Sequence, residues 1–242
     1  MEKVKPAAII IGASSGIGRA LAKELHNAGY RVGVSARKTE LLEELATELG
    51  ANLTIRKLDV TKTDESHMIF SQMAEELGRV DLVVISAGTG AINPELDWAK
   101  EEITISTNVL GFTRLADSAM NFFMAQGYGH LVGISSIAAL RGNSVAPAYN
   151  ASKAFVSNYL EGLRMKAFKQ NPKIQVTDIR PGFVDTAMAQ GEGLFWVASP
   201  EKAARQIYNA IKSRKKVAYI TRRWRLIAWL MQLLPDFLIY RM

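Results

Sequence analysis

Two side chains that can move a proton lie one helical turn apart in the segment 149–153. The i, i+4 spacing places the Tyr149 phenol and the Lys153 ammonium on the same face of a helix. An isolated phenol titrates near ~10, and a fixed positive neighbour lowers that pKa, which brings the group into the range of a general acid or base. The same pair on an exposed helix surface has no chemical role, so the interpretation depends on other segments.

A glycine-rich turn near the N-terminus has the form that binds a pyrophosphate. Glycines let the backbone approach the ligand, and the helix that follows offers unpaired N–H groups and a positive dipole end to the phosphates. An ordinary tight turn also contains glycines, but this one follows an apolar strand and opens an amphipathic helix, which is the context of a dinucleotide site. The residues expected to contact the cofactor here are Gly12, Ser14, Ser15, Gly16, Ile17 and Gly18.

Apolar runs alternate with helical periods along the chain. Parallel strands joined by right-handed crossovers form a sheet with helices on both faces, so we expect an α/β, doubly wound Rossmann fold. Residues 1–242 are expected to form one domain, because 48% hydrophobic content supplies one large core and no linker or repeat divides the chain. Strands are predicted near 7–11, 31–36, 53–58, 81–86, 130–135, 174–179 and 216–220.

Together these motifs resemble the short-chain dehydrogenase/reductase family, in its single-domain branch. The resemblance covers about residues 7 to 190 and includes further short motifs, most of them at predicted strand ends. These are Asp59-Val60, Ser86-Ala87-Gly88, Asn108, Ser135-Ser136 and Pro181-Gly182. The family implies a seven-stranded parallel sheet in the order 3-2-1-4-5-6-7 and reversible hydride transfer between a nicotinamide and a carbonyl or alcohol. Ser86 departs from the pattern, since the family has Asn there, so hydrogen bonding beside the central sheet must differ.

The resemblance also implies a role for each member of a catalytic set. Tyr149 donates the proton, and Ser136 hydrogen-bonds the substrate oxygen as charge builds on it. Lys153 holds the nicotinamide ribose and keeps the pKa of Tyr149 low, and Asn108 anchors a water that passes protons onward. Ser135 competes with Ser136, but the spacing of thirteen residues to Tyr149 favours Ser136. Further cofactor contacts are implied for Asp59 and Val60 at the adenine, for Ala87 and Gly88, which face the cofactor, and for Pro181, Gly182, Val184 and Thr186 beside the nicotinamide.

The end of the second predicted strand bears on the choice of cofactor. No acid stands there to hydrogen-bond the adenosine ribose of NAD. Arg37 offers instead a guanidinium fork that suits a 2′-phosphate, and Ser14 and Ser15 add hydroxyl donors. We therefore expect NADP(H) in preference to NAD(H). The alternative is a merely solvated arginine, which leaves NAD(H) possible.

Composition limits the other classes of function. The absence of cysteine excludes disulfides and thiol chemistry and fits the cytoplasm, and the three isolated histidines predict no catalytic metal. The polar start of the chain is too short for a signal peptide. A net charge of +7 raises the question of nucleic acid, but the basic residues are not interleaved with aromatic residues. We expect the excess of positive charge to bind cofactor phosphates or an anionic membrane surface. The alternative is that it merely keeps the protein soluble.

Two segments bear on substrate and partners. Residues 187–198 combine glycines with an apolar cluster, which predicts a substrate lid over a lipophilic carbonyl compound or else a static loop. The apolar C-terminal segment, 222–242, contains an uncharged stretch at 226–235, which is shorter than the ~20 residues that span a bilayer. It is expected to cover the substrate mouth, to pack on another subunit or to make peripheral membrane contact. The family implies a homodimer or homotetramer paired through long helices near 97–125 and 149–170.

Overall fold

The computed structural model describes residues 5–50, 53–186, 188, 195–235 and 237. Seven parallel strands form one sheet in the order β3-β2-β1-β4-β5-β6-β7, which confirms the predicted doubly wound topology. Each strand lies within two residues of its predicted bounds. The strands are β1 (Ala7–Ile11), β2 (Arg31–Ala36), β3 (Thr54–Lys57), β4 (Leu82–Ile85), β5 (Gly129–Ile134), β6 (Ile174–Pro181) and β7 (Val217–Ile220).

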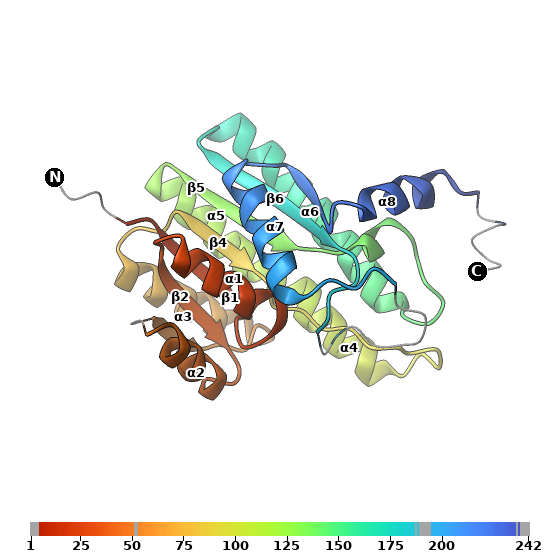
Figure 1. The fold of residues 1–242 in the computed structure, drawn as a ribbon, viewed down its shortest axis with the longest axis horizontal. Coiled ribbons are helices and arrows are strands. Elements are labelled where there is room, and N and C mark those ends of the chain that lie inside the picture. The colour runs from red at the N-terminus through yellow and green to blue at the C-terminus, as the bar shows by residue number, and fades with distance from the viewer. Residues whose placement is uncertain (1–4, 51–52, 187, 189–194, 236, 238–242) are drawn as a thin grey trace.

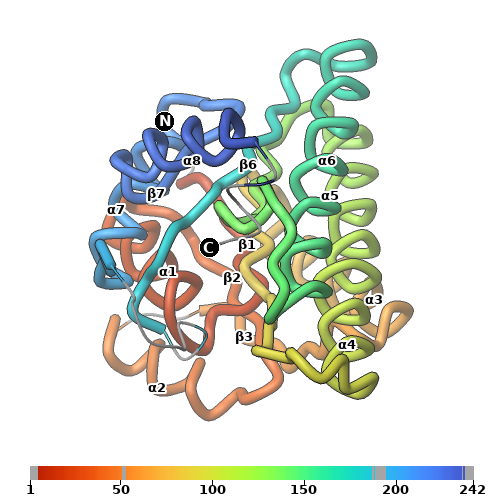
Figure 2. The backbone as a smooth tube through the Cα atoms, turned by 90° about the vertical axis from the view of Figure 1, so that its right-hand side faces the viewer, coloured from red at the N-terminus to blue at the C-terminus, as the bar shows by residue number. Residues whose placement is uncertain are grey.

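Two layers of helices enclose the sheet, one on each face (Figures 1 and 2). One layer contains α1 (Gly16–Asn27), α2 (Glu40–Leu49) and α7 (Pro200–Lys212). The other contains α3 (Thr63–Leu77), α4 (Trp98–Ile105), the π-helix η1 (Ser106–Gly111), α5 (Phe112–Gln126) and α6 (Pro147–Gln170). The long helix expected near 97–125 is thus α4, η1 and α5 in succession. The 3-10 turn η2 (Ile137–Leu140) follows β5, and α8 (Trp224–Leu233) follows β7.

The alternation of side chains along β1 builds both halves of the core. Ile9 and Ile11 pack with α3, α5 and α6, whereas Ala8 and Ile10 pack with α1, α2 and α7. Successive side chains of a strand point to opposite faces, so a strand covered on both sides must be apolar throughout. All five residues of β1 are buried. This sandwich fixes the strand ends, from which the loops of the site leave.

Helix α7 begins where the sequence predicts. The Ser199 hydroxyl accepts a hydrogen bond from the backbone N–H of Lys202 at 3.2 Å, and Pro200 is the first helical residue. A serine N-cap satisfies one of the unpaired N–H groups of the first turn, and proline fits there because its missing N–H would have no partner. The cap thus fixes the start of the helix that follows the 195–198 segment.

His130 in β5 makes the stability of this fold depend on pH. Its Nε2 atom lies 2.8 Å from the Thr177 hydroxyl, and burial, helped by the charge of Arg214, lowers the pKa of His130 to about 4. Between pH 6.5 and 4 the unfolded chain binds a proton that the folded chain refuses, so stability is full above about 6.5 and falls as the pH falls. We expect a loss of about 2 to 3 kcal/mol near pH 4.5.

Urea unfolding near pH 7 and near pH 4.5 checks this expectation. The variant His130→Gln removes the titration, so the stability gap between the two proteins should narrow as the pH falls. His67→Gln is the matched control, since His67 bonds the Ser118 hydroxyl at 2.8 Å but is not among the residues buried in the core. An equal gap at both pH values would contradict the role of His130.

Candidate active site

The predicted site residues lie at the carboxyl edge of the sheet, around β1 and β4. Ile11, the last residue of β1, is in register with Ser35 of β2 and with Ile85 of β4. The order of the strands reverses between β1 and β4, and open α/β sheets bind their ligands in the crevice at such a point. The loops that leave these strands therefore converge at one place.

The glycine-rich loop needs its glycines for close packing. Gly12 and Gly16 have φ of 89° and 53°, in the left-handed region that favours glycine. A Cβ on Gly12 would lie 2.5 Å from the Ala87 nitrogen, and one on Gly18 would clash with the Gly12 carbonyl oxygen. One on Gly16 would lie 2.9 Å from Thr186 Cγ2. The predicted phosphate loop, Ala87 and Thr186 are thus in contact, at the N-terminus of α1.

The four residues of the predicted catalytic set come together beside this loop. The Lys153 Nζ atom donates to the Ile134 carbonyl at 3.1 Å and lies 5.7 Å from the centre of the Tyr149 ring. The Ser136 hydroxyl lies near the Tyr149 phenol and acts to lower the pKa of that phenol, while the Ser136 Oγ accepts from the Ala138 N–H at 3.1 Å. A Cβ on Gly88 would lie 3.2 Å from Lys153 Nζ and 3.3 Å from Asn108 Oδ1, so the loop after β4 packs on both. This arrangement gathers an acid, a hydroxyl donor and a cation around one point.

The electrostatics of the pair differ from the sequence expectation in one respect. The sequence predicts that Lys153 lowers the pKa of Tyr149, but burial raises that pKa, and the hydrogen bond with Ser136 offsets only part of the rise. Burial also lowers the pKa of Lys153 to about 8, while the charge of Asp178 acts in the opposite direction. The reason is desolvation, which disfavours the phenolate and the ammonium alike. Tyr149 is therefore a protonated phenol at neutral pH.

Asn108 lies in the π-helix η1, 1% exposed, and holds two parts of the site together. Its Nδ2 donates to the Thr89 carbonyl at 2.7 Å and to the Ser152 hydroxyl at 2.9 Å, and its Oδ1 accepts from the Thr89 N–H at 2.8 Å. The side chain thus ties the loop after β4 to α6. π-turns of this kind occur often at functional sites. The water-anchoring role of Asn108 stays a prediction.

A buried carboxylate behind Lys153 was missed by the sequence analysis. Asp178 of β6 is 0% exposed and accepts from the hydroxyls of Ser135 and Ser157, the latter at 2.7 Å. Arg180 Nε donates to the same carboxylate at 2.7 Å, and its Nη1 lies 3.2 Å from the Tyr219 hydroxyl. The Ser135 hydroxyl is therefore hydrogen-bonded to Asp178, whereas Ser136 lies beside Tyr149. The available signal was an acid and an arginine two residues apart within a mostly buried strand.

Two smaller contributors were also missed. A Cβ on Gly90 would lie 2.9 Å from Tyr149 Cε2, so the phenol ring packs directly on this glycine. Asn150 donates from Nδ2 to the carbonyls of Ala138 at 3.1 Å and Arg141 at 2.8 Å, which fastens the segment after Ser136 to α6. In the sequence, only a glycine at position 90 and an asparagine next to Tyr149 indicated these two contributions.

The residues predicted for the adenosine end lie together at the ends of β2 and β3. Arg37 is exposed, and Asp59 accepts from the Thr61 N–H at 3.0 Å and the Thr61 hydroxyl at 2.8 Å. Burial acts to raise the pKa of Asp59, but these hydrogen bonds and the charges of Arg37 and Lys62 lower it overall. Val60 packs against η1, because a Cβ on Gly111 would lie 2.5 Å from the Val60 carbonyl oxygen.

At the other end, β6 leads into an aromatic cluster made of Phe183, Phe195, Trp196 and Trp224. Trp224 is 5.3 Å from Phe183, 5.1 Å from Phe195 and 5.9 Å from Trp196 between ring centres. A Cβ on Gly182 would clash with the Trp224 indole, so the cluster adjoins the predicted nicotinamide end. Val184 is buried and bridges to Ala198, and Pro181 ends β6. Of the predicted lid, 187 and 189–194 lie outside the described residues.

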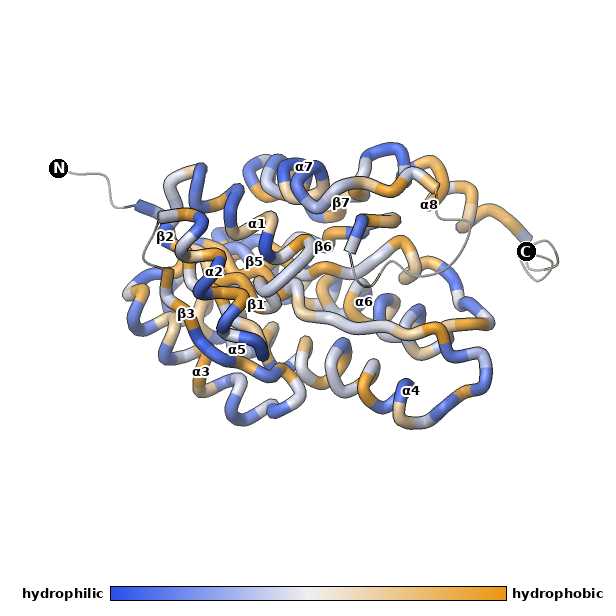
Figure 3. The backbone as a smooth tube through the Cα atoms, turned by 60° about the horizontal axis from the view of Figure 1, so that its bottom comes forward, coloured by the Kyte–Doolittle hydropathy of each residue, from blue (hydrophilic) through white to orange (hydrophobic). Residues whose placement is uncertain are grey.

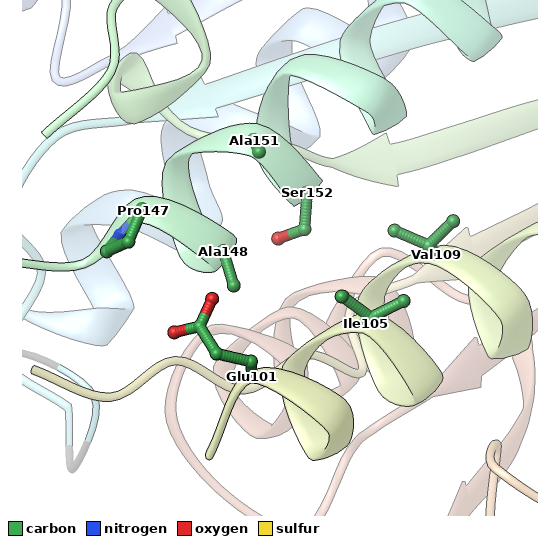
Figure 4. Close-up of a pocket in the computed structure, with 7 residues that line it drawn as sticks. All are labelled: Glu101, Ile105, Val109, Pro147, Ala148, Ala151 and Ser152. Atoms are coloured by element: carbon green, nitrogen blue, oxygen red, sulfur yellow. The ribbon is translucent and has the colours of Figure 1, made fainter. Parts of the chain in front are cut away.

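A separate groove lies between α4, η1 and α6 (Figure 4). Ala148, Ala151 and Ser152 line it from α6, opposite Ile105 and Val109, with Glu101 at one side. At about 100° per residue, Ala148 and Ala151 point at least about 100° away from Tyr149 and Lys153, whereas Ser152 lies about 60° from Tyr149. The groove therefore lies mainly on a neighbouring face of α6, and Ser152, which is bonded to Asn108, stands between that face and the reacting groups.

Comparisons with known proteins agree with this geometry. The model of the family described as short chain dehydrogenase matches residues 6–194. An uncharacterized oxidoreductase of Myxococcus xanthus is 38% identical over 186 residues, covering 75% of this chain and 73% of the relative. An uncharacterized oxidoreductase of Mycobacterium tuberculosis is 34% identical over 189 residues, covering 74% of each.

Solved structures show the same fold with either cofactor. A short chain dehydrogenase/reductase of Burkholderia phymatum, in complex with NAD, superposes with a TM-score of 0.84 at 20% identity, covering 95% of this chain and 94% of that one. An alcohol dehydrogenase of Thermococcus sibiricus, complexed with 5-hydroxy-NADP, gives 0.77 at 26% identity, covering 89% and 94%. An actinorhodin polyketide ketoreductase with NADPH gives 0.80 at 24% identity, covering 89% and 95%.

Proposed function

The chain belongs to the short-chain dehydrogenase/reductase family of NAD(P)-binding oxidoreductases, and we propose that it reduces a ketone or aldehyde to an alcohol with NADPH. The observation that carries this proposal is the meeting of Tyr149, Ser136 and Lys153 beside the glycine-rich loop. The raised pKa of Tyr149 keeps its phenol protonated near neutral pH, which is the state that donates a proton in reduction.

The residues present fit a dinucleotide. We assign the diphosphate to the loop of Gly12, Gly16 and Gly18, where side chains larger than hydrogen would occupy the space or strain the backbone. Ser15 precedes α1 without a side-chain bond to the helix, so its hydroxyl remains for the ligand. The remaining contacts are proposed for Ser14, Ile17, Arg37, Asp59, Val60, Ala87, Gly88, Pro181, Gly182, Val184 and Thr186.

The protein's own groups handle the proton while the bound cofactor supplies the hydride. Tyr149 donates its hydroxyl proton to the carbonyl oxygen, and Ser136 hydrogen-bonds the same oxygen as negative charge develops on it. Lys153 binds the nicotinamide ribose and, as an ammonium below its pKa of about 8, stabilises the phenolate that Tyr149 becomes. Asn108 positions the loop after β4 against α6, so that Lys153 and Tyr149 keep their places.

We propose a lipophilic substrate because the site is walled on one side by the aromatic cluster. Its rings offer apolar area and few polar groups, which suits a carbonyl compound with a hydrocarbon body. The lid expected over 187–198 stays part of this proposal. Pairing of subunits through α5 and α6 also stays part of the proposal. On α6, Phe155 and Phe168 are 38% and 79% exposed.

Cofactor oxidation measured with a series of carbonyl compounds of increasing chain length tests the activity and the substrate class together. NADPH and NADH are titrated first, and the tighter-binding cofactor is then used for the series. Turnover that rises with chain length supports the proposal. Tight NADH binding would favour NAD-dependent alcohol oxidation instead, and cofactor binding without any turnover would favour a non-catalytic nicotinamide-binding protein.

Arg37→Glu is expected to weaken NADPH binding about 100-fold, because it replaces charge-assisted hydrogen bonds to the 2′-phosphate with repulsion. NADH lacks this phosphate, so its affinity should change little. Fluorescence titration of both cofactors provides the measurement. Lys38→Glu is the matched control, since it makes the same change of charge at the next exposed residue. An equal loss in both variants would show a general effect of charge, and would remove the assignment of Arg37.

A further inference from the structure

We propose that α8 and the basic chain leading to it dock on an anionic lipid surface. This C-terminal docking face consists of the exposed side chains of Arg222, Arg225, Leu226, Trp229, Leu230 and Leu233. None of the helices in the described part of the chain has the length and apolarity that a membrane span needs. The face would lie in the plane of the interface, as amphipathic helices do.

The segment that ends in α8 is strongly basic. Residues 202–235 contain nine lysines and arginines and no aspartate or glutamate. Over the whole sequence, by contrast, 30 basic residues are matched by 23 acidic ones, so the excess of positive charge is concentrated here. A basic segment without acids is attracted to anionic headgroups, and each cation near the surface strengthens binding about fivefold.

The outer side of α8 is apolar although it faces solvent. Leu226, Trp229 and Leu233 are 69%, 64% and 61% exposed, and Leu230 is 48% exposed. At about 100° per residue these four positions fall within roughly 100° of arc, which makes a continuous stripe. Figure 3 shows the apolar character of α8 at the end of the molecule. Leucine and tryptophan beside arginine form the composition that membrane interfaces favour.

The helix is held so that this stripe points outward. Trp224 and Ala228 are buried against Ile137 on the inner side. Arg141 fixes the C-terminal end, since its Nε donates to the Met231 carbonyl at 3.0 Å and its Nη2 to the Leu234 carbonyl at 2.9 Å. The outer stripe is therefore a fixed surface rather than a loosely attached end.

Charge also distinguishes a lipid surface from a second copy of the chain. Two docking faces brought together would place arginines of both copies side by side, and like charges at an interface oppose association. An anionic bilayer offers complementary headgroups to the arginines and an apolar layer to the stripe. Because Trp224 belongs both to α8 and to the aromatic cluster, the docked surface would lie beside the proposed substrate entrance.

Flotation of the full chain with vesicles tests the proposal. The protein should float with vesicles of phosphatidylcholine and phosphatidylglycerol, should bind weakly to phosphatidylcholine alone, and should be released by high salt. Arg222→Gln with Arg225→Gln should lower binding to the anionic vesicles about 30-fold. Trp229→Gln with Leu233→Gln should lower it at least about tenfold.

Matched controls change equally exposed residues elsewhere. Lys166→Gln with Lys169→Gln removes two exposed cations of α6, and Trp98→Gln removes a tryptophan of α4 that is 67% exposed. Both should float as the parent does, and NADPH titration confirms that each variant is folded. Tyr149→Phe should also float, so the outcome is independent of the proposed activity.

Three results would overturn the proposal: no flotation with anionic vesicles, equal losses in the control variants, or α8 variants that dissociate an oligomer while still binding vesicles. The last result would assign the docking face to contact between copies of the chain.

Discussion

Replacing Tyr149 with phenylalanine is expected to lower the kcat of carbonyl reduction by at least about 1000-fold, because it removes the group that donates the proton. NADPH binding should change by less than about twofold, since only a hydroxyl is lost and the ring keeps its packing on Gly90. Cofactor oxidation at saturating substrate gives kcat, and fluorescence titration gives the affinity for NADPH.

Tyr159→Phe is the matched control for this experiment. Tyr159 lies in the same helix, and its hydroxyl donates to Asp117 at 2.6 Å on the side of α5. Both changes remove one phenolic hydroxyl from α6, but only Tyr149 lies beside Ser136 and Lys153. The control should keep its kcat. If Tyr149→Phe kept most of the activity, or if both variants lost it equally, Tyr149 would not be the proton donor.

The fold could be predicted from the sequence because its signals are local. The central strands β1 and β4 are short apolar runs, and the glycine-rich loop marks the end of β1. The start of α7 could be predicted for the same reason, since an N-cap depends on a few adjacent residues, here Ser199 and Pro200. The strand order came from the resemblance to a family, because no local pattern decides which strands are neighbours.

The electrostatics of the site could not be predicted in the same way. The pKa of Tyr149 depends on how completely the surrounding loops exclude water, and the sequence shows only that a lysine is near. The Asp178 network depends on the register of β5 with β6, which pairs Gly133 with Asp178 and brings Ser135 to the carboxylate. The contact of Ser135 with Asp178 joins residues 43 positions apart, so motif spacing does not reveal it.

Lys153→Met is expected to abolish activity and at the same time to stabilise the fold. Without the ammonium, the phenolate of Tyr149 and the ribose lose their partner, so kcat should fall at least about 1000-fold. In the folded parent, however, the Lys153 ammonium is buried away from water, as its lowered pKa of about 8 shows. Against the ordinary value of 10.5, that shift corresponds to about 3 kcal/mol of destabilisation near neutral pH.

The hydrogen bond from Lys153 to the Ile134 carbonyl offsets about 1 kcal/mol of this cost, so the methionine variant should be about 2 kcal/mol more stable near pH 7. Between pH 8 and 10.5 the folded parent releases a proton that the unfolded chain keeps, so the stability of the parent rises with pH. The advantage of the variant should therefore disappear by about pH 10. Urea unfolding without cofactor at both pH values measures it.

Lys166→Met serves as the control, because Lys166 is exposed on the same helix and should show neither effect. A methionine variant that is less stable than the parent near pH 7 would mean that Lys153 is a structural residue whose contacts outweigh its desolvation. A gain in stability together with loss of activity would mean that the desolvation of Lys153 outweighs its contacts. The buried ammonium would then be retained for its action on Tyr149 and the ribose, with the Asp178 carboxylate reducing the cost of keeping it charged.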